Sequence, residues 1–322
     1  MLACFFVPRF FGGFHLIKTD STVLRGQVSF QAQDRFDLLV DGETLPATLS
    51  GNFRRTLKQQ HTQLVVGDWV SGTLQAGSMR ITAMQPRTSL LTRSTSSRFR
   101  ESGGQAIAAN LTTVVIVTSA NHDFNLERLR RYHAIATVSR AQPAFLITKT
   151  DLISDAALAK LNDQLTATFP GTSVYTLGAD QEPAVKLAEL LQPDACLALI
   201  GSSGVGKSTL VGKLTGEALF TKTIRQDDAH GRHATTNRRL FVLRTGTRLI
   251  DTPGMRAVGV AAASAGFAAQ FAPLEALAAN CKFRNCRHVS EPGCAVKAAV
   301  QAGTLPEATY QAYLKYQAKA AR

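Results

Sequence analysis

This chain of 322 residues has no apolar run that approaches the roughly 18 residues of a membrane-spanning helix. Its first 21 residues are apolar and rich in phenylalanine, but they have no basic start and are interrupted by Pro8 and Arg9. These features argue against a secretory signal peptide. We therefore treat residues 1–21 as an N-terminal extension and assign it no function.

Cysteine is scarce as well, with five residues in all, and an odd number cannot pair completely into disulfides. Three of the five lie within fourteen residues, with a histidine among them. That clustering indicates a metal site and not a disulfide framework, and it favours a reducing compartment. We expect a cytoplasmic protein.

Acidic residues are fewer than basic ones, 23 against 36, and the basic excess is unevenly distributed. Residues 1–100 carry 12 basic and 6 acidic side chains, and residues 281–322 carry 7 and 2. The residues between them carry 17 and 15 and are nearly neutral. The basic flanks favour polyanion binding, and the middle segment favours an enzyme. The alternative is a basic surface that only aids solubility.

Residues 22–86 are predicted to form a small β-barrel, with an OB-fold as the leading candidate, because short strands follow one another at close spacing. Turn signals such as Asp41-Gly42 separate the strands. OB-folds often bind nucleic acid, and a purely structural barrel is the alternative. The expected strands are Val23–Phe30, Phe36–Val40, Thr44–Ser50, Val65–Val70 and Met79–Met84.

Residues 87–105 are rich in serine, threonine and glycine, which predicts a basic linker. This linker either contacts phosphates or is a solvated connection that binds nothing. Its arginines are Arg87, Arg93, Arg98 and Arg100.

Residues 106–262 alternate between strand-like and helix-like patterns, which predicts a mostly parallel α/β sheet. Residues 263–322 are rich in alanine and predict a mainly helical C-terminal domain that the cysteine cluster interrupts. The expected α/β elements are strands at 113–118, 144–147, 173–176, 196–200, 240–244 and 248–250, with helices near 125–139 and 153–168.

A glycine-rich loop with the P-loop pattern GSSGVGKS at 201–208 follows the fourth of these strands. Its glycines let backbone N–H groups surround phosphates, Lys207 can reach the β- and γ-phosphates, and Ser208 can ligate Mg²⁺. The helix that follows points its positive end at the phosphates. The nucleotide-binding set is Gly201, Ser202, Ser203, Gly204, Val205, Gly206, Lys207, Ser208 and Thr209.

A second motif, Asp251-Thr-Pro-Gly254, ends the last expected strand. An aspartate there can hold Mg²⁺ through water, and the Gly254 N–H can contact the γ-phosphate. A third motif, TKTD at 148–151, follows the strand at 144–147. The Asp151 carboxylate can accept from guanine N1–H and N2–H₂, a donor pair that adenine lacks, and the stem of Lys149 can cover the base. Thr148 stands where an N-K-x-D motif has asparagine.

The order of these motifs differs from that of most GTPases, in which the P-loop comes first, then D-x-x-G, then N-K-x-D. Here the guanine motif precedes both. Joining the ends of the usual domain and opening it after D-x-x-G gives this order on the same six-stranded sheet. We therefore predict a circularly permuted GTPase domain, with the C-terminal domain attached directly after the nucleotide-sensing motif.

The C-terminal cluster offers three thiolates and one imidazole, a set that suits tetrahedral Zn²⁺. Four protein ligands leave no open position, so the predicted site is structural; three free cysteines and a surface histidine are the alternative. The ligands would be Cys281, Cys286, His288 and Cys294. Basic residues that could face RNA phosphates are Lys282, Arg284, Arg287 and Lys297. Tyrosines expected to pack in the core of a late helix, in preference to stacking on bases, are Tyr310, Tyr313 and Tyr316.

In combination, these motifs resemble a circularly permuted bacterial GTPase family, the ribosome small subunit-dependent GTPase A (RsgA) family. The matching segments are VGDWV at 66–70, AAN at 108–110, TKTDL at 148–152, GSSGVGKSTL at 201–210, GRHATTNRRL at 231–240, DTPGMR at 251–256 and the cysteine-containing tail at 281–300. The resemblance implies an OB-fold, a permuted GTPase domain, a C-terminal zinc domain and a role in late maturation of the small ribosomal subunit. Two departures from the family are Thr148 and Gly178-Ala179, the latter where a base-contacting loop usually has Ser-Ala.

Two switch residues complete the predicted catalytic set. Thr235 and Thr236 are the candidates for the threonine that closes on Mg²⁺ and the γ-phosphate, and Thr236 is preferred. Met255 follows D-x-x-G, where many GTPases have a glutamine that orients the attacking water, and a thioether cannot do this usefully. His233 is the nearest replacement by sequence, and a surface histidine with no catalytic part is the alternative.

We thus predict Mg²⁺-dependent GTP hydrolysis, used as a conformational timer and stimulated by the ribosome. The expected partners of this monomer are the small ribosomal subunit and its rRNA. The predicted catalytic residues are Lys207, His233, Thr236 and Gly254. One rival is an RNA-binding assembly factor with nucleotide as a structural ligand only, against which the intact Lys207, Ser208 and Asp251 argue. Another is a P-loop ATPase, against which Asp151 argues.

Overall fold

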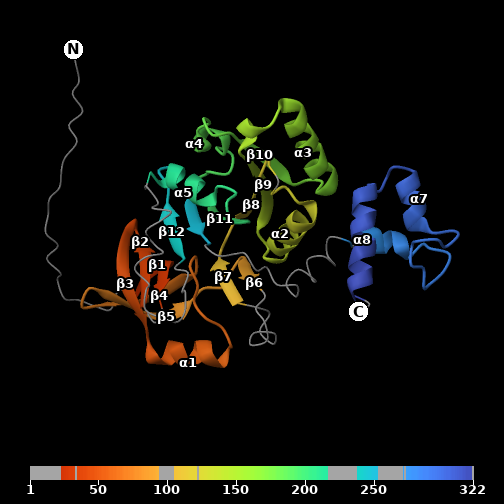
Figure 1. Cartoon of the computed structure of the whole chain (residues 1–322). Helices are drawn as coiled ribbons and strands as arrows, with labels where there is room; N and C mark the ends of the chain where they lie inside the picture. Colours follow the sequence, from red (N-terminus) through yellow and green to blue (C-terminus); the bar gives the residue numbers. More distant parts are fainter. Residues whose placement is uncertain are drawn as a thin grey trace, which may run out of the picture.

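The fold comes from a computed structural model of the chain (Figure 1). The structure describes residues 23–32, 35–93, 105–121, 123–216, 238–252, 271 and 273–320. Within this part of the chain, no helix is long and apolar enough to cross a membrane. The predicted residues that lie outside the described ranges are His233, Thr236, Gly254, Met255, Arg98 and Arg100, together with residues 1–21.

The N-terminal unit is a closed five-stranded barrel, as predicted. Its strands are β1 (Val23–Ala32), β2 (Arg35–Val40), β3 (Glu43–Leu49), β4 (Trp69–Gln75) and β5 (Ser78–Met84). They pair in the order β1-β2-β3-β5-β4, and β4 returns to pair with β1. Asp41 and Gly42 both have positive φ and form the tight turn between β2 and β3. Inward-facing residues of all five strands fill the barrel with an apolar core.

A helix that the sequence analysis did not predict, α1 (Gly51–Gln59), lies between β3 and β4. The Ser50 side chain accepts from Phe53 N at 3.3 Å and so caps its first turn. Phe53 and Leu57, one turn apart, bury the inner face of α1 against the barrel core. The outer face is polar and solvent-exposed.

The central unit is a six-stranded sheet in the order β10-β9-β8-β11-β13-β12. All neighbours are parallel except β12 and β13, which form the predicted hairpin. This arrangement confirms the predicted α/β domain. Its strands are β8 (Thr113–Ser119), β9 (Gln142–Thr148), β10 (Ser173–Leu177), β11 (Cys196–Gly201), β12 (Arg239–Val242) and β13 (Arg248–Asp251). Its helices are α2 (Leu126–Val138), η1 (Thr150–Leu152), α3 (Asp155–Thr168), α4 (Pro183–Lys186) and α5 (Lys207–Thr215).

The barrel and the central sheet meet edge to edge. β1 pairs with β12 through Phe30 and Arg239, so the strands of both units form one continuous sheet. At a second crossing Gly67 has a φ of +95°, and a Cβ there would lie 2.2 Å from Ala109 O. Only glycine fits this close approach. The segment between the units also forms a small antiparallel pair, β6 (Leu90–Arg93) with β7 (Gln105–Ala109), in a range where no strand was predicted.

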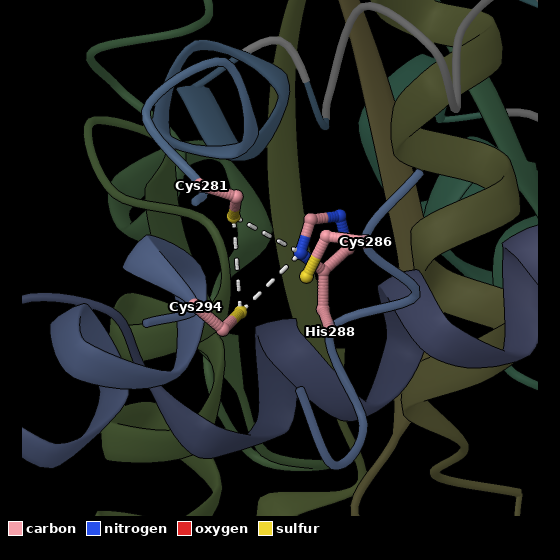
Figure 2. Close-up of side chains that lie close together, drawn as sticks. All are labelled: Cys281, Cys286, His288 and Cys294. Atoms are coloured by element: carbon pink, nitrogen blue, oxygen red, sulfur yellow. Dashed lines mark hydrogen bonds between the residues drawn. The ribbon is translucent and has the colours of Figure 1, made fainter. Parts of the chain in front are cut away.

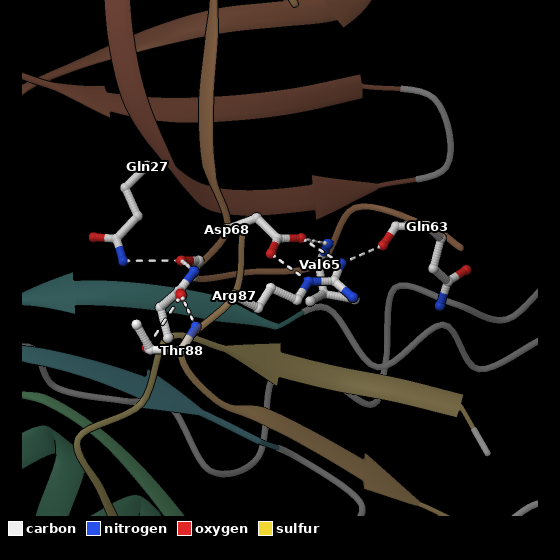
Figure 3. Close-up of polar contacts among 8 residues, drawn as sticks. Gln27, Gln63, Val65, Asp68, Arg87 and Thr88 are labelled. Atoms are coloured by element: carbon white, nitrogen blue, oxygen red, sulfur yellow. Dashed lines mark hydrogen bonds and ion pairs between the residues drawn. The ribbon is translucent and has the colours of Figure 1, made fainter. Parts of the chain in front are cut away.

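Asn110, which directly follows β7, stabilises the close approach of Gly67 to Ala109 through side-chain hydrogen bonds. Its Nδ2 donates to Gly67 O at 2.9 Å, and its Oδ1 accepts from Thr88 N at 3.0 Å. Gln27 of the barrel also donates to Gly67 O, at 3.0 Å (Figure 3). Two side chains that are distant in sequence, Gln27 and Asn110, therefore donate to the same backbone carbonyl of Gly67.

Arg87 belongs to this joint and not to a phosphate-binding linker (Figure 3). Its Nε and Nη2 donate to the two carboxylate oxygens of the fully buried Asp68, both at 2.7 Å. Nη2 also donates to Gln63 O at 2.6 Å, and Val65 N donates to Asp68 Oδ2 at 2.8 Å. Burial raises the pKa of Asp68, although the hydrogen bond and charge of Arg87 oppose this shift. Phosphate contact is therefore no longer supported for Arg87.

The C-terminal unit contains helical residues 273–278, α7 (Ala295–Gln301) and α8 (Glu307–Ala320). Tyr310 and Tyr313 of α8 are buried in its apolar core, as predicted. The side chain of Tyr316 lies outside the described residues.

Candidate nucleotide site and metal centre

The phosphate-binding loop connects the buried strand β11 to α5. Its conformation requires glycine at the start, because Gly201 has a φ of +148° and a Cβ there would lie 2.2 Å from Val117 O of the neighbouring β8. Gly206 caps α5 with a φ of +95°. The first turn of α5, with Ser208 and Thr209 exposed, therefore opens directly onto the loop. Unpaired N–H groups of such a helix end attract phosphate.

Lys207 folds back over this loop. Its Nζ donates to Gly201 O at 2.8 Å and also to Ser202 O. The ammonium group is thereby held above the curved backbone where a phosphate chain would lie. The same two carbonyls orient it, so a bound phosphate would meet a positive charge already in place.

Thr148, the departure from the guanine motif, connects that motif to the P-loop. Its Oγ1 lies 2.7 Å from Val205 O and 3.0 Å from Thr118 O, and the residue is buried. One hydroxyl has one proton, so it donates to only one of these carbonyls at a time. An asparagine amide has two donors and could satisfy both. Thr148 thus keeps a link between β9 and the P-loop with one hydrogen bond fewer.

Lys149 provides a second link between the two motifs. It adopts the left-handed conformation with a φ of +57°, uncommon for a residue with a side chain. This turn carries its Nζ to 2.8 Å from Gly204 O. The lysine stem therefore spans the distance between the guanine motif and the phosphate loop, where it can cover a base.

Asp151 lies beside the predicted base-contacting loop. Its Oδ1 accepts from Ala179 N at 2.8 Å. Glycine is not demanded at position 178, since the nearest atom to an added Cβ would be Thr150 Oγ1, at 3.4 Å. The family serine would fit there, so the departure at Gly178 leaves the backbone arrangement intact.

Asp251 stands at the end of β13, which pairs with β11 ahead of the P-loop. Burial raises its pKa, and the nearby charge of Lys207 opposes this shift. Next to it, the buried Thr252 donates its hydroxyl to Leu199 O at 2.6 Å, which ties the chain to β11 as it leaves the sheet.

Tyr132 of α2 is a site residue that the sequence analysis missed. It is buried, with the Ser202 side chain of the P-loop nearby. Burial raises the pKa of its phenol, and the Ser202 side chain opposes this shift. No short motif contains Tyr132, and its helical spacing from other apolar residues indicates only a core position.

The four predicted metal ligands converge in the C-terminal unit, with all four ligand atoms within 4.8 Å of one another (Figure 2). His288 Nδ1 lies 3.5 Å from Cys281 Sγ and 3.4 Å from Cys294 Sγ, and the two sulfur atoms are 3.9 Å apart. Tetrahedral bonds of about 2.3 Å to sulfur and about 2.0 Å to nitrogen would separate sulfurs by ~3.8 Å and sulfur from nitrogen by ~3.5 Å. The cluster can therefore hold a tetrahedral metal ion.

Backbone contacts hold the ligand loop in this shape. His288 has a φ of +62°, and Tyr310 of α8 donates its hydroxyl to His288 O at 2.5 Å. Glu291 accepts backbone N–H groups of Arg287, Val289 and Ser290 at 2.9–3.0 Å. These bonds, the Arg287 N–H first, lower the pKa of its carboxyl to about 2. Such supporting contacts orient metal ligands.

Comparison with known proteins agrees with this arrangement. Residues 84–261 match the family described as RsgA GTPase. A protein of Lactiplantibacillus plantarum named Small ribosomal subunit biogenesis GTPase RsgA 2 is 39% identical over 94% of this chain and 84% of its own length. A protein of Methanosarcina acetivorans named Small ribosomal subunit biogenesis GTPase RsgA is 40% identical over 90% and 78%.

Two solved structures share the fold. The crystal structure of YjeQ from Thermotoga maritima superposes with a TM-score of 0.68 at 23% identity, over 93% of this chain and 99% of that one. The structure of YloQ, described as a circularly permuted GTPase, gives 0.66 at 23% identity, over 92% and 94%. The circularly permuted GTPase fold that the order of motifs predicts is thus confirmed.

Proposed function

This chain belongs to the RsgA GTPase family and is a GTP hydrolase, and from that premise we propose that it acts as a GTP-dependent timer in maturation of the small ribosomal subunit. The observation that carries the proposed site is the pair of bonds that join the guanine motif to the P-loop. Thr148 Oγ1 lies 2.7 Å from Val205 O, and Lys149 Nζ lies 2.8 Å from Gly204 O. They bring the base-reading and phosphate-reading segments together despite their reversed order.

Each residue of the proposed site has a distinct role. Asp151 accepts from the guanine N1–H and N2–H₂ groups, and Lys149 covers the base. The backbone N–H groups of residues 201–209 surround the phosphates. Lys207 neutralises the negative charge that develops on the β- and γ-phosphates during hydrolysis. Ser208, and Asp251 through water, would hold Mg²⁺, which prefers oxygen ligands. When bound, Mg²⁺ would neutralise phosphate charge.

Outside the described residues, we assign roles from the sequence alone. Gly254 contacts the γ-phosphate through its N–H, Thr236 closes on Mg²⁺, and His233 orients the attacking water. Met255 cannot replace the missing glutamine. Because the water-orienting group must be brought into place, hydrolysis by the isolated protein is slow and the ribosomal subunit accelerates it.

The partner in this proposal is the small ribosomal subunit, as the names of the relatives indicate for those proteins. We infer that the monomer works in the cytoplasm and contacts rRNA through its barrel and C-terminal unit, because the basic excess lies in these two segments. We also infer that the ion in the C-terminal cluster is zinc, since three thiolates and one imidazole favour it over magnesium or calcium.

The test of function is multiple-turnover phosphate release with and without purified small subunits. We expect turnover to rise by about 10²-fold or more with subunits, on the scale of general acid–base effects. His233→Ala should remove most of that rise while the Kd for GTP stays unchanged. Equal turnover with and without subunits would refute activation by the partner. Normal stimulation of His233→Ala would refute only the role of the histidine.

The test of base recognition is Asp151→Asn. The amide can donate to the O2 of xanthine, which replaces the guanine amino group, so the variant should lose at least ~10-fold in affinity for GDP and gain affinity for XDP. Both constants can be measured by titration calorimetry. Asp155→Asn, at the start of α3, makes the same chemical change elsewhere and should bind both nucleotides as the unmodified protein does. Unchanged GDP affinity in Asp151→Asn would exclude this carboxylate from the base site.

A further inference from the structure

We propose that Lys213 is a positioning residue for guanine recognition, an inference that rests on the proposed role of Asp151. Lys213 lies in the last turn of α5, about two turns after Gly206 at the end of the P-loop. It is not part of any nucleotide-binding motif. Its Nζ donates to Ala179 O at 2.8 Å. This contact attaches the base-contacting loop to the helix that begins at the phosphates.

The backbone of Ala179 is held on both sides of its Cα. Its N–H donates to Asp151 Oδ1 at 2.8 Å, while its carbonyl accepts from Lys213. The preceding residue is fixed as well, because Gly178 N donates to Gln181 Oε1 at 3.0 Å. The Asp151 carboxylate is therefore oriented by the peptide N–H of Ala179, and Lys213 fixes the next peptide group along the chain through the Ala179 carbonyl.

The loop needs this attachment because it has little else to hold it. It is a short connection between β10 and the single-turn helix α4. Gly178 contributes no side chain, and it adds backbone freedom that a residue with a Cβ would restrict. Both bonds at Ala179 are exposed to solvent, so each is individually weak. Together they fix the two peptide groups that flank the Ala179 Cα, and the two bonds come from independent elements.

The helical position of Lys213 has a consequence for the nucleotide. α5 begins at Lys207 and carries the phosphate-binding N-terminus, so a contact from the same helix to the base loop sets the separation between the two halves of the site. The guanine contacts of Asp151 are then preorganised relative to the phosphates. Loss of Lys213 should weaken base recognition and leave the phosphate chemistry unchanged.

The experiment uses the full-length Lys213→Met variant, which keeps the stem and removes the donor. Dissociation constants for GDP, a non-hydrolysable GTP analogue and IDP, which lacks the 2-amino group, are measured by calorimetry, together with kcat. We expect the affinities for GDP and the GTP analogue to fall by the same factor, about 3- to 10-fold. The loss for IDP should be smaller, so that the preference for guanine over hypoxanthine shrinks. kcat and Tm should not change.

Two controls make the outcome specific. Lys213→Arg keeps a donor and should restore the preference for GDP over IDP, and Lys160→Met on α3 removes the same charge from another exposed position and should change nothing. Three results would overturn the proposal: unchanged affinities, a larger loss for the GTP analogue than for GDP, which would indicate charge attraction to phosphate, or an equal loss for IDP. If Asp151→Asn also binds GDP normally, the proposed guanine site itself fails, whereas a normal Lys213→Met with a weakened Asp151→Asn refutes the positioning role alone.

Discussion

Lys207→Ala should lower kcat for GTP hydrolysis by about 10²- to 10³-fold, the scale seen when one preorganised charge-stabilising donor is removed from an active site. The reason is geometric as well as electrostatic. The ammonium group is held by two carbonyls of the P-loop, Gly201 O at 2.8 Å and Ser202 O, directly over the curved backbone. Its attraction grows as charge develops on the transferred phosphate, so the transition state loses more than the ground state. Multiple-turnover hydrolysis with saturating GTP and small subunits measures this loss.

Lys149→Ala is the matched control. Lys149 also donates to a carbonyl of the P-loop, Gly204 O at 2.8 Å, but its proposed role is to cover the base. Its removal should raise the Kd for GTP and GDP alike and leave kcat within a few-fold of the unmodified value. If Lys207→Ala retained its kcat and lost only affinity, Lys207 would be a binding residue, and the proposed charge stabilisation in the transition state would be wrong.

The backbone geometry of the proposed nucleotide site could be predicted from the sequence because it depends on local interactions. A glycine-rich loop that follows a buried strand and ends in lysine and serine has a conformation set by its own residues. Gly201 is an example, because it approaches Val117 O more closely than any residue with a Cβ could. The strand and helix periodicities around it are equally local. Even the permuted order follows from the sequence alone, because the order of motifs along the chain is independent of the way they meet in space.

What could not be predicted depends on contacts between distant segments. Arg87 reads as one of four arginines in a polar linker, and only the fold places it against the buried Asp68, 19 residues earlier in the chain. Lys213 is an ordinary helical residue until the fold brings it to Ala179, and Tyr132 is one until the fold buries it near Ser202. Their partners are not fixed by spacing, so no local pattern reports them.

The unpredicted helix α1 is a different case, because its signals were local. Ser50 precedes a helix that buries Phe53 and Leu57 four residues apart, which is the spacing of a helical face. Only two apolar residues occur in that face, and strand-like sequences precede and follow the helix, so its helical pattern is weak by comparison. Short amphipathic helices with a narrow apolar face are therefore the elements that a barrel-like sequence conceals most easily.

Removal of the zinc ion proposed for the C-terminal cluster should have the second large effect, and Cys286→Ala is the variant that tests it. The unmodified protein should contain one zinc ion per chain by elemental analysis, and the variant should contain none. Because the four ligand side chains pack against one another where the ion would bind, metal-binding energy should contribute directly to the folding of this unit. The unit has a small apolar core around Phe271 and Tyr313, too small to compensate for a loss on that scale. Residues 273–320 should therefore lose protection from hydrogen exchange and proteolysis.

The control for this prediction is Cys196→Ala. Cys196 lies in β11, and burial raises the pKa of its thiol to about 12, so it supplies no thiolate for a metal at neutral pH. The variant should keep its zinc and lose only the stability expected of a small cavity, about 1 kcal/mol. GDP affinity should survive in Cys286→Ala as well, because the described nucleotide site draws no residue from the C-terminal unit. A metal-free but fully protected Cys286→Ala would show that the apolar core folds alone and that the cluster is not a structural centre.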